Sequence, residues 1–111
     1  MGGAAGDDRV SYDAIRHAHE SWLALLLQLF NKVLATGIVP EAWGAATVGM
    51  LAKPGKDADD WTGYRGISLC SCISKVFEKI VQRRLSDHLD EHNVLHHSQY
   101  GFRKQHSTAD A

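Results

Sequence analysis

Three cationic side chains surround a predicted turn in the middle of the sequence. Lys53 and Lys56 flank Pro54-Gly55, and Arg65 opens the next predicted strand. Proline fixes φ and glycine accepts the positive φ of a tight turn, so the segment predicts two strands joined by a polar loop. Cations on such an arm suit the binding of phosphate groups. The alternative is a solvated surface loop, because charged runs usually face water.

A second set of cations recurs on one face of a helix predicted over residues 71–92. Its members are Lys75, Lys79, Arg83 and Arg84. Lysine and arginine repeated along one face are typical of a track that follows a nucleic-acid backbone. The alternative is an ordinary solvated helix face.

The sequence predicts neither a metal site nor a catalytic residue. Cys70 and Cys72 with His96-His97 offer zinc-binding atoms, but the cysteine spacing is too short for a usual zinc site, and small buried cysteines are the alternative. The paired carboxylates Asp7-Asp8 and Asp59-Asp60 fall in loops, whereas two-metal phosphoryl chemistry needs carboxylates held rigidly on strands.

The chain of 111 residues is long enough for one small domain with a modest core. Its net charge of −1 provides no global field for nucleic acid, so any such binding requires a local patch. Closely spaced cysteines and the lack of a long apolar run favour an intracellular location, in the nucleus or the cytoplasm, with no membrane contact.

Two helices and a hairpin must position the cations. Apolar residues at helical spacing predict one long helix that starts near Ser11 or Asp13 and ends at Gly37. Its segment 22–30 is apolar almost all round, which predicts burial on more than one side. A strand is predicted over residues 46–52.

The ends of the chain complete this outline. The second helix is expected to be capped by Ser71 and stopped by Asn93. Residues 1–10 are predicted to be flexible and residues 94–111 to form a loop. Ser107 or Thr108 resembles a helix start with no helix behind it, so we expect the sequence to be part of a longer one.

Three motifs stand in a fixed order: LQLFNKVLATGIVPEAWGAATVGMLAKPGKD, YRGISLCSCISKVFEKIVQRRL and QYGFRKQHSTADA. Together they closely resemble the fingers region of reverse transcriptases from non-LTR (LINE-type) retrotransposons, over about residues 5–111. The resemblance implies an α+β fold in which two main helices pack on a short β-hairpin. Residues 1–111 would then be a partial reverse transcriptase domain, the fingers subdomain of a right-hand polymerase, with residues 94–111 at the junction towards a missing palm.

The resemblance also implies roles for individual residues. The positions of Lys53 and Arg65 contact the triphosphate of the incoming nucleotide in this family. The motif Gln99, Tyr100, Gly101, Phe102 and Arg103 lies near the template strand and the nucleotide pocket. This chain has Gly66 where the family usually has proline, and glycine should hold the preceding Arg65 less firmly.

The parent protein implied by the resemblance is an RNA-directed DNA polymerase that uses an RNA template and dNTPs. Its Mg²⁺ ions are held by palm aspartates that would follow Ala111, so this chain alone should not polymerise. Two alternatives remain: a non-catalytic RNA- or protein-binding module, and an inert retrotransposon relic.

Overall fold

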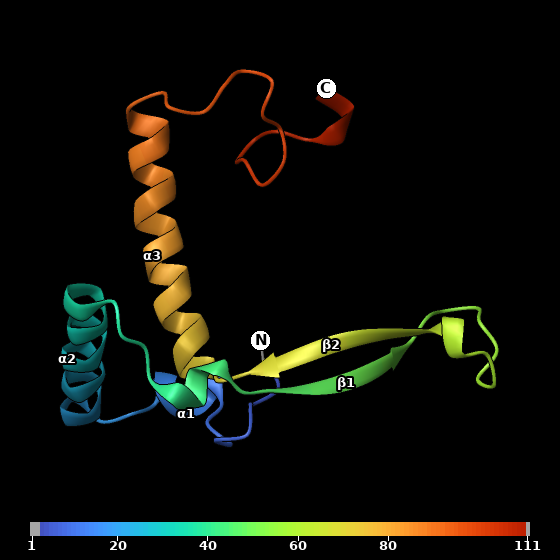
Figure 1. Cartoon of the computed structure of the whole chain (residues 1–111), viewed down its shortest axis with the longest axis horizontal. Helices are drawn as coiled ribbons and strands as arrows, with labels where there is room; N and C mark the ends of the chain where they lie inside the picture. The colour runs from blue at the N-terminus through green and yellow to red at the C-terminus, as the bar shows by residue number, and fades with distance from the viewer. Residues whose placement is uncertain (1–2, 111) are drawn as a thin grey trace. The chain divides into compact units, whose positions relative to one another are not determined.

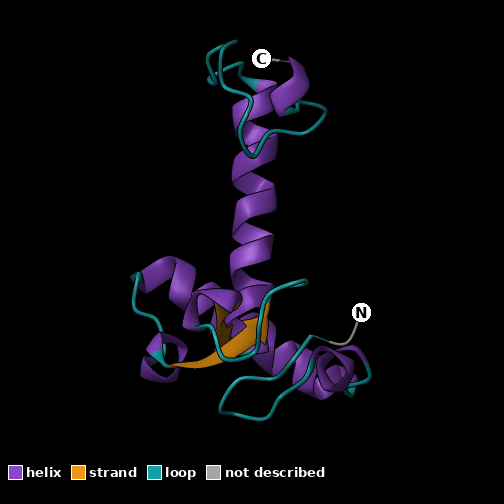
Figure 2. Ribbon diagram, turned by 90° about the vertical axis from the view of Figure 1, so that its right-hand side faces the viewer, coloured by secondary structure: helices purple, strands orange, loops and turns teal. Residues whose placement is uncertain are grey.

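The structure is a computed structural model that describes residues 3–110. The chain divides into two compact units, one up to Phe77 and one from Glu78, and each is considered on its own. In chain order the elements are α1 (Tyr12–Arg16), α2 (Glu20–Thr36), the 3-10 helix η1 (Glu41–Gly44), β1 (Ala46–Ala52), η2 (Trp61–Gly63), β2 (Tyr64–Cys70), α3 (Cys72–Glu91) and η3 (Thr108–Asp110). Helices and a two-stranded sheet (Figure 2) confirm the α+β class. No helix among residues 3–110 is both long and apolar enough to cross a membrane.

The first predicted helix is in fact two helices, so the prediction of one long helix was wrong. Ser11 caps α1, with its Oγ accepting from the Ala14 amide at 3.1 Å. His17 then ends α1, and His19, in an extended conformation, caps α2 by accepting from the Ser21 amide at 3.2 Å. Histidine side chains that bond to nearby backbone compete with helix continuation, which explains the break. Gly37 ends α2 with φ 70°, as predicted.

The predicted burial of α2 on more than one side was also wrong. Only Phe30 and Val33 are buried among the described residues of α2. Trp22, Leu25 and Leu27 expose 65%, 56% and 59% of their area. One face of the helix therefore packs within the described chain, while its other apolar faces meet solvent.

An aromatic cluster forms the centre of the first unit. Phe30 of α2 lies 5.3 Å from Phe77 of α3 and 6.3 Å from Trp43 of η1, measured between ring centroids. Trp43 and Phe77 are 5.5 Å apart. These tilted and edge-on arrangements are the favourable ones for aromatic pairs, so the cluster ties together three elements distant in sequence.

The strand predicted over residues 46–52 is confirmed, and it forms an antiparallel hairpin with β2 (Figure 1). The register runs from Ala46 opposite Cys70 to Ala52 opposite Tyr64. Within the first unit, α2 does not pack along the described residues of this hairpin, contrary to the prediction that the main helices pack on it. Val48 and Met50 remain 66% and 61% exposed. The hairpin is thus held by its own ladder and by contacts at its base.

The N-terminal loop supplies the contacts at that base. Gly6 is buried so closely that a Cβ there would lie 2.8 Å from the Cys70 carbonyl and 2.9 Å from the Ser71 nitrogen. Asp8 accepts a 2.7 Å hydrogen bond from the Ser71 hydroxyl, and Asp7 accepts one from Thr47. The flexibility predicted for residues 1–10 stays a prediction, and residues 1 and 2 lie outside the described part.

In the second unit, α3 stops at Asn93 and a short helical turn begins near Ser107, as predicted. Asn93 adopts φ 49°, its amide donates to the Asp90 carbonyl, and the Val94 amide donates to the Leu89 carbonyl at 3.0 Å. This is the hydrogen-bond pattern of a Schellman motif. The short turn is η3, where Asp110 accepts from the Ser107 amide at 2.8 Å, as in a capping box.

Candidate nucleotide and nucleic-acid site

The pairing of β1 with β2 places Lys53 and Arg65 on the same face of the hairpin. The Lys53 amide donates to the Gly63 carbonyl at 2.7 Å, which extends the ladder by one pair. Directly opposite residues share a face, and side chains alternate along a strand. Leu51 and Arg65 are opposite each other, so Lys53, two residues after Leu51, lies diagonally beside Arg65.

These two cations line one shallow hollow of about 120 Å³. Its lining is formed by Leu51, Ala52, Lys53, Pro54 and Arg65. The chain turns back beside it at Gly55, whose φ of 76° suits glycine. The structure therefore brings together the two residues to which the family resemblance assigns nucleotide binding.

Lys56, the third cation near the turn, belongs to the same face but does not line the hollow. A Cβ built on Gly63 would meet the Cβ of Lys56 at 3.0 Å, so the stem of Lys56 lies over Gly63. Gly63 is opposite Lys53, and its face is therefore the face of Lys53 and Arg65.

Thr62 and Asp60, two residues that the sequence analysis did not connect with Lys53, position it. The Lys53 ammonium donates to the Thr62 carbonyl at 3.0 Å. Asp60 caps η2 by accepting from the Thr62 amide at 2.9 Å and from the Thr62 hydroxyl at 2.7 Å. These hydrogen bonds from Thr62 lower the pKa of Asp60 below its ordinary value of 3.8. An aspartate two residues before a threonine at a helix start is a sequence signal that could have revealed this cap.

Gly66 lies opposite Met50, one residue past Arg65. A Cβ there would lie 3.8 Å from Val48 Cγ1 and 3.9 Å from Met50 Sδ, which is ordinary van der Waals contact. Packing therefore leaves room for a larger residue, and the glycine is not required by crowding.

The QYGFR segment forms a compact loop in the second unit. Arg103 Nη1 donates to the carbonyls of His96 and Gln99 at 3.2 and 3.4 Å, and Gln99 Nε2 donates to the Gly101 carbonyl at 3.1 Å. Phe102 has φ 58° and is fully exposed. Arg103 thus ties the loop together, and Phe102 projects from it.

The same loop borders a hollow of about 280 Å³ with residues of α3. Gln82, Ser86, Leu89 and Asp90 line it from the helix, with Leu95, Gln99, Gly101, Phe102, Arg103 and Lys104 from the loop. Lys104 also pairs with Asp87 at 3.6 Å. Tyr100 faces His106 instead, with ring centroids 5.4 Å apart. Of the residues to which the family resemblance assigns the template, Gln99, Gly101, Phe102 and Arg103 line this hollow, whereas Tyr100 forms an aromatic pair.

Three of the four cations predicted on α3 belong to the second unit. Lys79, Arg83 and Arg84 are exposed, and no acidic group among the described residues lies within ion-pair distance of them. Lys75 belongs to the first unit and is half-buried. The exposed three remain available to an anionic partner.

The cysteines and histidines do not assemble a metal centre in the part of the chain that the structure describes. Cys72 is fully buried and Cys70 is half-buried, both as free thiols. His96 and His97 stack on each other with centroids 4.0 Å apart. Among residues 3–110, no group of three or more histidine, cysteine or carboxylate side chains is placed to hold a metal ion.

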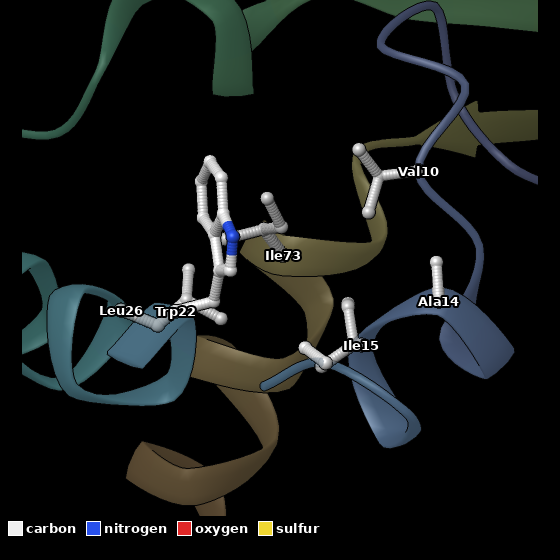
Figure 3. Close-up of a pocket in the computed structure, with 7 residues that line it drawn as sticks. Val10, Ala14, Ile15, Trp22, Leu26 and Ile73 are labelled. Atoms are coloured by element: carbon white, nitrogen blue, oxygen red, sulfur yellow. The ribbon is translucent and has the colours of Figure 1, made fainter. Parts of the chain in front are cut away.

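An apolar hollow in the first unit is lined by no charged side chain. It has a volume of about 370 Å³ and lies between α1, α2 and the first turn of α3 (Figure 3). Its lining comprises Val10, Ala14, Ile15, Ala18, Trp22, Leu26 and Ile73. Such a surface accommodates apolar side chains but holds no group that binds nucleotides or metals.

Comparison with known families shows the family to which the chain belongs. The family described as reverse transcriptase (RNA-dependent DNA polymerase) matches residues 52–111, which include the turn, β2, α3 and the QYGFR loop. The chain belongs to this family.

Curated relatives of this reverse transcriptase chain also match residues before position 52, where the family match begins. It is 33% identical over 105 residues to the "Probable RNA-directed DNA polymerase from transposon BS" of Drosophila melanogaster, covering 95% of the chain. It is 35% identical over 107 residues to the "RNA-directed DNA polymerase from mobile element jockey" of the same species, covering 96%. The chain spans about 12% of the length of each relative. The resemblance to reverse transcriptases of non-LTR retrotransposons is therefore confirmed.

Proposed function

We propose that this reverse transcriptase chain is a fingers segment that grips the triphosphate of an incoming dNTP with Lys53 and Arg65. The observation that carries the proposal is the hollow on one face of the hairpin that both cations line. A second part of the proposal assigns the template strand to the loop of Gln99–Arg103, as in the family.

The two cations have complementary chemistry for a triphosphate. Lys53 keeps two ammonium hydrogens for phosphate oxygens after donating one to Thr62. Arg65 presents a planar fork that matches two oxygens of one phosphate. Because the hairpin fixes the spacing of the two cations, they are preorganised for the triphosphate. They stabilise the negative charge that develops on its phosphate oxygens.

The template part of the proposal rests on the QYGFR loop in the second unit. The fully exposed ring of Phe102 offers a surface for a base to stack on, and stacking tolerates any base. Arg103 holds the loop through two backbone carbonyls and thereby positions Phe102.

The family's polymerases are expected to use Mg²⁺ and a palm in addition to such a segment. The proposal assigns binding and positioning to this chain, and the Mg²⁺ ions would be held by the palm of the longer polymerase. RNA template and dNTP are the proposed partners within a longer polymerase.

The proposed triphosphate clamp of Lys53 and Arg65 is tested by titrating the chain with inorganic tripolyphosphate. Binding is monitored through the amide chemical shifts of residues 51–66. Each of Lys53→Ala and Arg65→Ala should weaken binding by about 2- to 5-fold, because exposed ion pairs contribute up to about 1 kcal/mol. Lys32→Ala, which removes an exposed cation of α2, is the matched control and should leave binding unchanged. Equal losses in all three variants would show non-specific attraction and refute the clamp.

A second candidate function is RNA binding along α3. The specific observation in its favour is the unpaired state of Lys79, Arg83 and Arg84 among the described residues. This function does not compete with the clamp, since the cations involved are different.

A further inference from the structure

The opposite face of the hairpin carries a second hollow with different chemistry. It has a volume of about 390 Å³ and is lined by Met50, Ala58, Asp59, Trp61 and Tyr64. Met50 and Tyr64 occupy even positions of the ladder, so they face away from Leu51, Lys53 and Arg65. The hairpin therefore separates a cationic face from an apolar and acidic one.

Trp61 is the main surface of this hollow. Its side chain is 85% exposed, an unusually open position for a residue that normally contributes large apolar burial. η2 holds it in place, because Asp60 caps that turn through Thr62. An open aromatic face on a capped turn is suited to a ligand that stacks on it.

Tyr64 and Asp59 complete the chemistry of the hollow. The Tyr64 hydroxyl donates to the Ala58 carbonyl at 2.7 Å, which fixes its ring beside the loop. Of the five lining residues, Asp59 alone is charged, and no described donor is bonded to its carboxylate. An aromatic face beside a free carboxylate favours a cation with a flat or apolar body.

We propose that this hollow binds an arginine side chain of a partner protein. The guanidinium stacks on the indole of Trp61 and pairs with the carboxylate of Asp59, while Met50 and Tyr64 enclose the aliphatic stem. Arginine fits better than lysine because its planar group stacks and forms two parallel hydrogen bonds. Nucleic acid fits worse, since the carboxylate of Asp59 in the hollow would repel its phosphates.

The test is an NMR titration of the ¹⁵N-labelled chain with a five-residue peptide of alternating glycine and arginine. The Trp61 indole N–H, assigned by its absence from Trp61→Phe, should shift saturably together with the amides of residues 58–64. The same peptide with citrulline in place of arginine keeps the shape, loses the charge and should not bind.

Variants locate the binding to the proposed residues. Asp59→Asn and Trp61→Ala should each weaken binding by about 2- to 5-fold, which is the range for an exposed ion pair or cation–π contact. Asp57→Asn and Trp22→Ala remove a similar charge and a similarly exposed indole elsewhere, and both should bind as the unchanged chain does. Should Trp61→Ala open the hairpin, Trp61→Phe should retain intermediate affinity.

Two results would overturn the proposal. One is binding of the citrulline peptide with the same affinity as the arginine peptide. The other is an affinity for the arginine peptide that Asp59→Asn and Trp61→Phe leave unchanged. The triphosphate titration is independent of both, because Lys53 and Arg65 occupy the other face of the hairpin.

Discussion

Arg65 owes its position to the alternation of the ladder around it. The Lys53 amide bonds to Gly63, so the pairs Lys53–Gly63 and Leu51–Arg65 are of the hydrogen-bonded kind. The pairs Ala52–Tyr64 and Met50–Gly66 alternate with these and are therefore non-hydrogen-bonded pairs. The amide of Gly66 therefore points away from β1, and a residue without an N–H can occupy this position.

Gly66→Pro should consequently preserve the hairpin and hold Arg65 more firmly. Proline limits the preceding residue to the extended region that Arg65 already occupies in β2. It also reduces the entropy of the unfolded chain, so we expect the free energy of unfolding to rise by about 0.4–1 kcal/mol. Tripolyphosphate should bind about 2-fold more tightly through preorganisation. Urea unfolding and the same titration measure the two effects.

The matched control lies one residue further along β2. Ile67 faces Gly49 in a hydrogen-bonded pair, so proline there removes a ladder bond. Ile67→Pro should lose about 1 kcal/mol more than Ile67→Ala, which removes side-chain packing alone. If Gly66→Pro proved as disruptive as Ile67→Pro, the assigned hydrogen-bond pattern would be wrong.

Asp60 makes the order of η2 depend on pH. Its pKa in the folded chain is lowered from 3.8 by the hydrogen bonds of Thr62. A lowered pKa means that the ionised carboxylate stabilises the fold at pH values above its ordinary pKa of 3.8. This stabilisation is lost as the pH falls through the pKa of Asp60 in the folded chain. The Thr62 amide shift should stay constant from about pH 7 down to about pH 4.5 and change below 3.8. Asp60→Asn should remove this titration while keeping a cap, and an identical curve in both chains would contradict the assignment.

At the scale of elements, the sequence predicted what depends on local chemistry. The strand over 46–52, the end of α2 at Gly37 and the end of α3 at Asn93 follow from alternation and backbone preference, which neighbouring residues determine. The break at His17–His19 was missed because histidine is an uncommon helix cap, and apolar spacing continued across it. The exposure of Trp22 was missed because an apolar pattern predicts a face that seeks burial but not the surface that covers it.

The candidate site divides in the same way. The cations of the turn were identifiable from their types, whereas their shared face required the register of β1 with β2. Thr62 was missed because it contributes a backbone carbonyl, which any residue possesses. The hollow at Trp61 was missed because it forms only where Ala58, Asp59 and Trp61 lie beside Met50 and Tyr64 of the hairpin.

The N-terminal loop should stabilise the base of the hairpin through its contacts there. Gly6→Ala would force a Cβ to within 2.8 Å of the Cys70 carbonyl, and backbone atoms cannot yield as a flexible side chain does. We expect a loss of about 1–3 kcal/mol in the free energy of unfolding, the usual range for overpacking. Hydrogen exchange at Lys75 should accelerate with it, since the Lys75 amide donates to the Ser71 carbonyl in the first turn of α3.

Gly44→Ala is the control for this change, because a Cβ there meets nothing within 4 Å. It should leave both unfolding and exchange close to those of the unchanged chain. Equal stability of Gly6→Ala and Gly44→Ala would show that residues 4–8 do not hold the base of the hairpin.

For the whole molecule, a net charge of −1 conceals a local separation of charge. Lys53 and Arg65 line a hollow of the first unit, and Lys79, Arg83 and Arg84 are exposed on the part of α3 within the second unit. Attraction of an anionic strand therefore depends on these patches and not on the overall field. Its strength must depend on salt, because each neutralised phosphate releases counterions.

This dependence gives a quantitative test of RNA binding along α3. Each cation that neutralises a phosphate of a single strand contributes about −0.7 to the slope of log K against log salt. Lys79→Ala combined with Arg83→Ala should therefore make the slope less negative by about 1.4 for a single-stranded oligoribonucleotide, measured by fluorescence anisotropy. Arg16→Ala combined with Lys32→Ala lowers the net charge equally, from −1 to −3, yet alters α1 and α2 instead. If both double variants changed the slope by the same amount, RNA would respond to total charge alone and the α3 face would not be a binding surface.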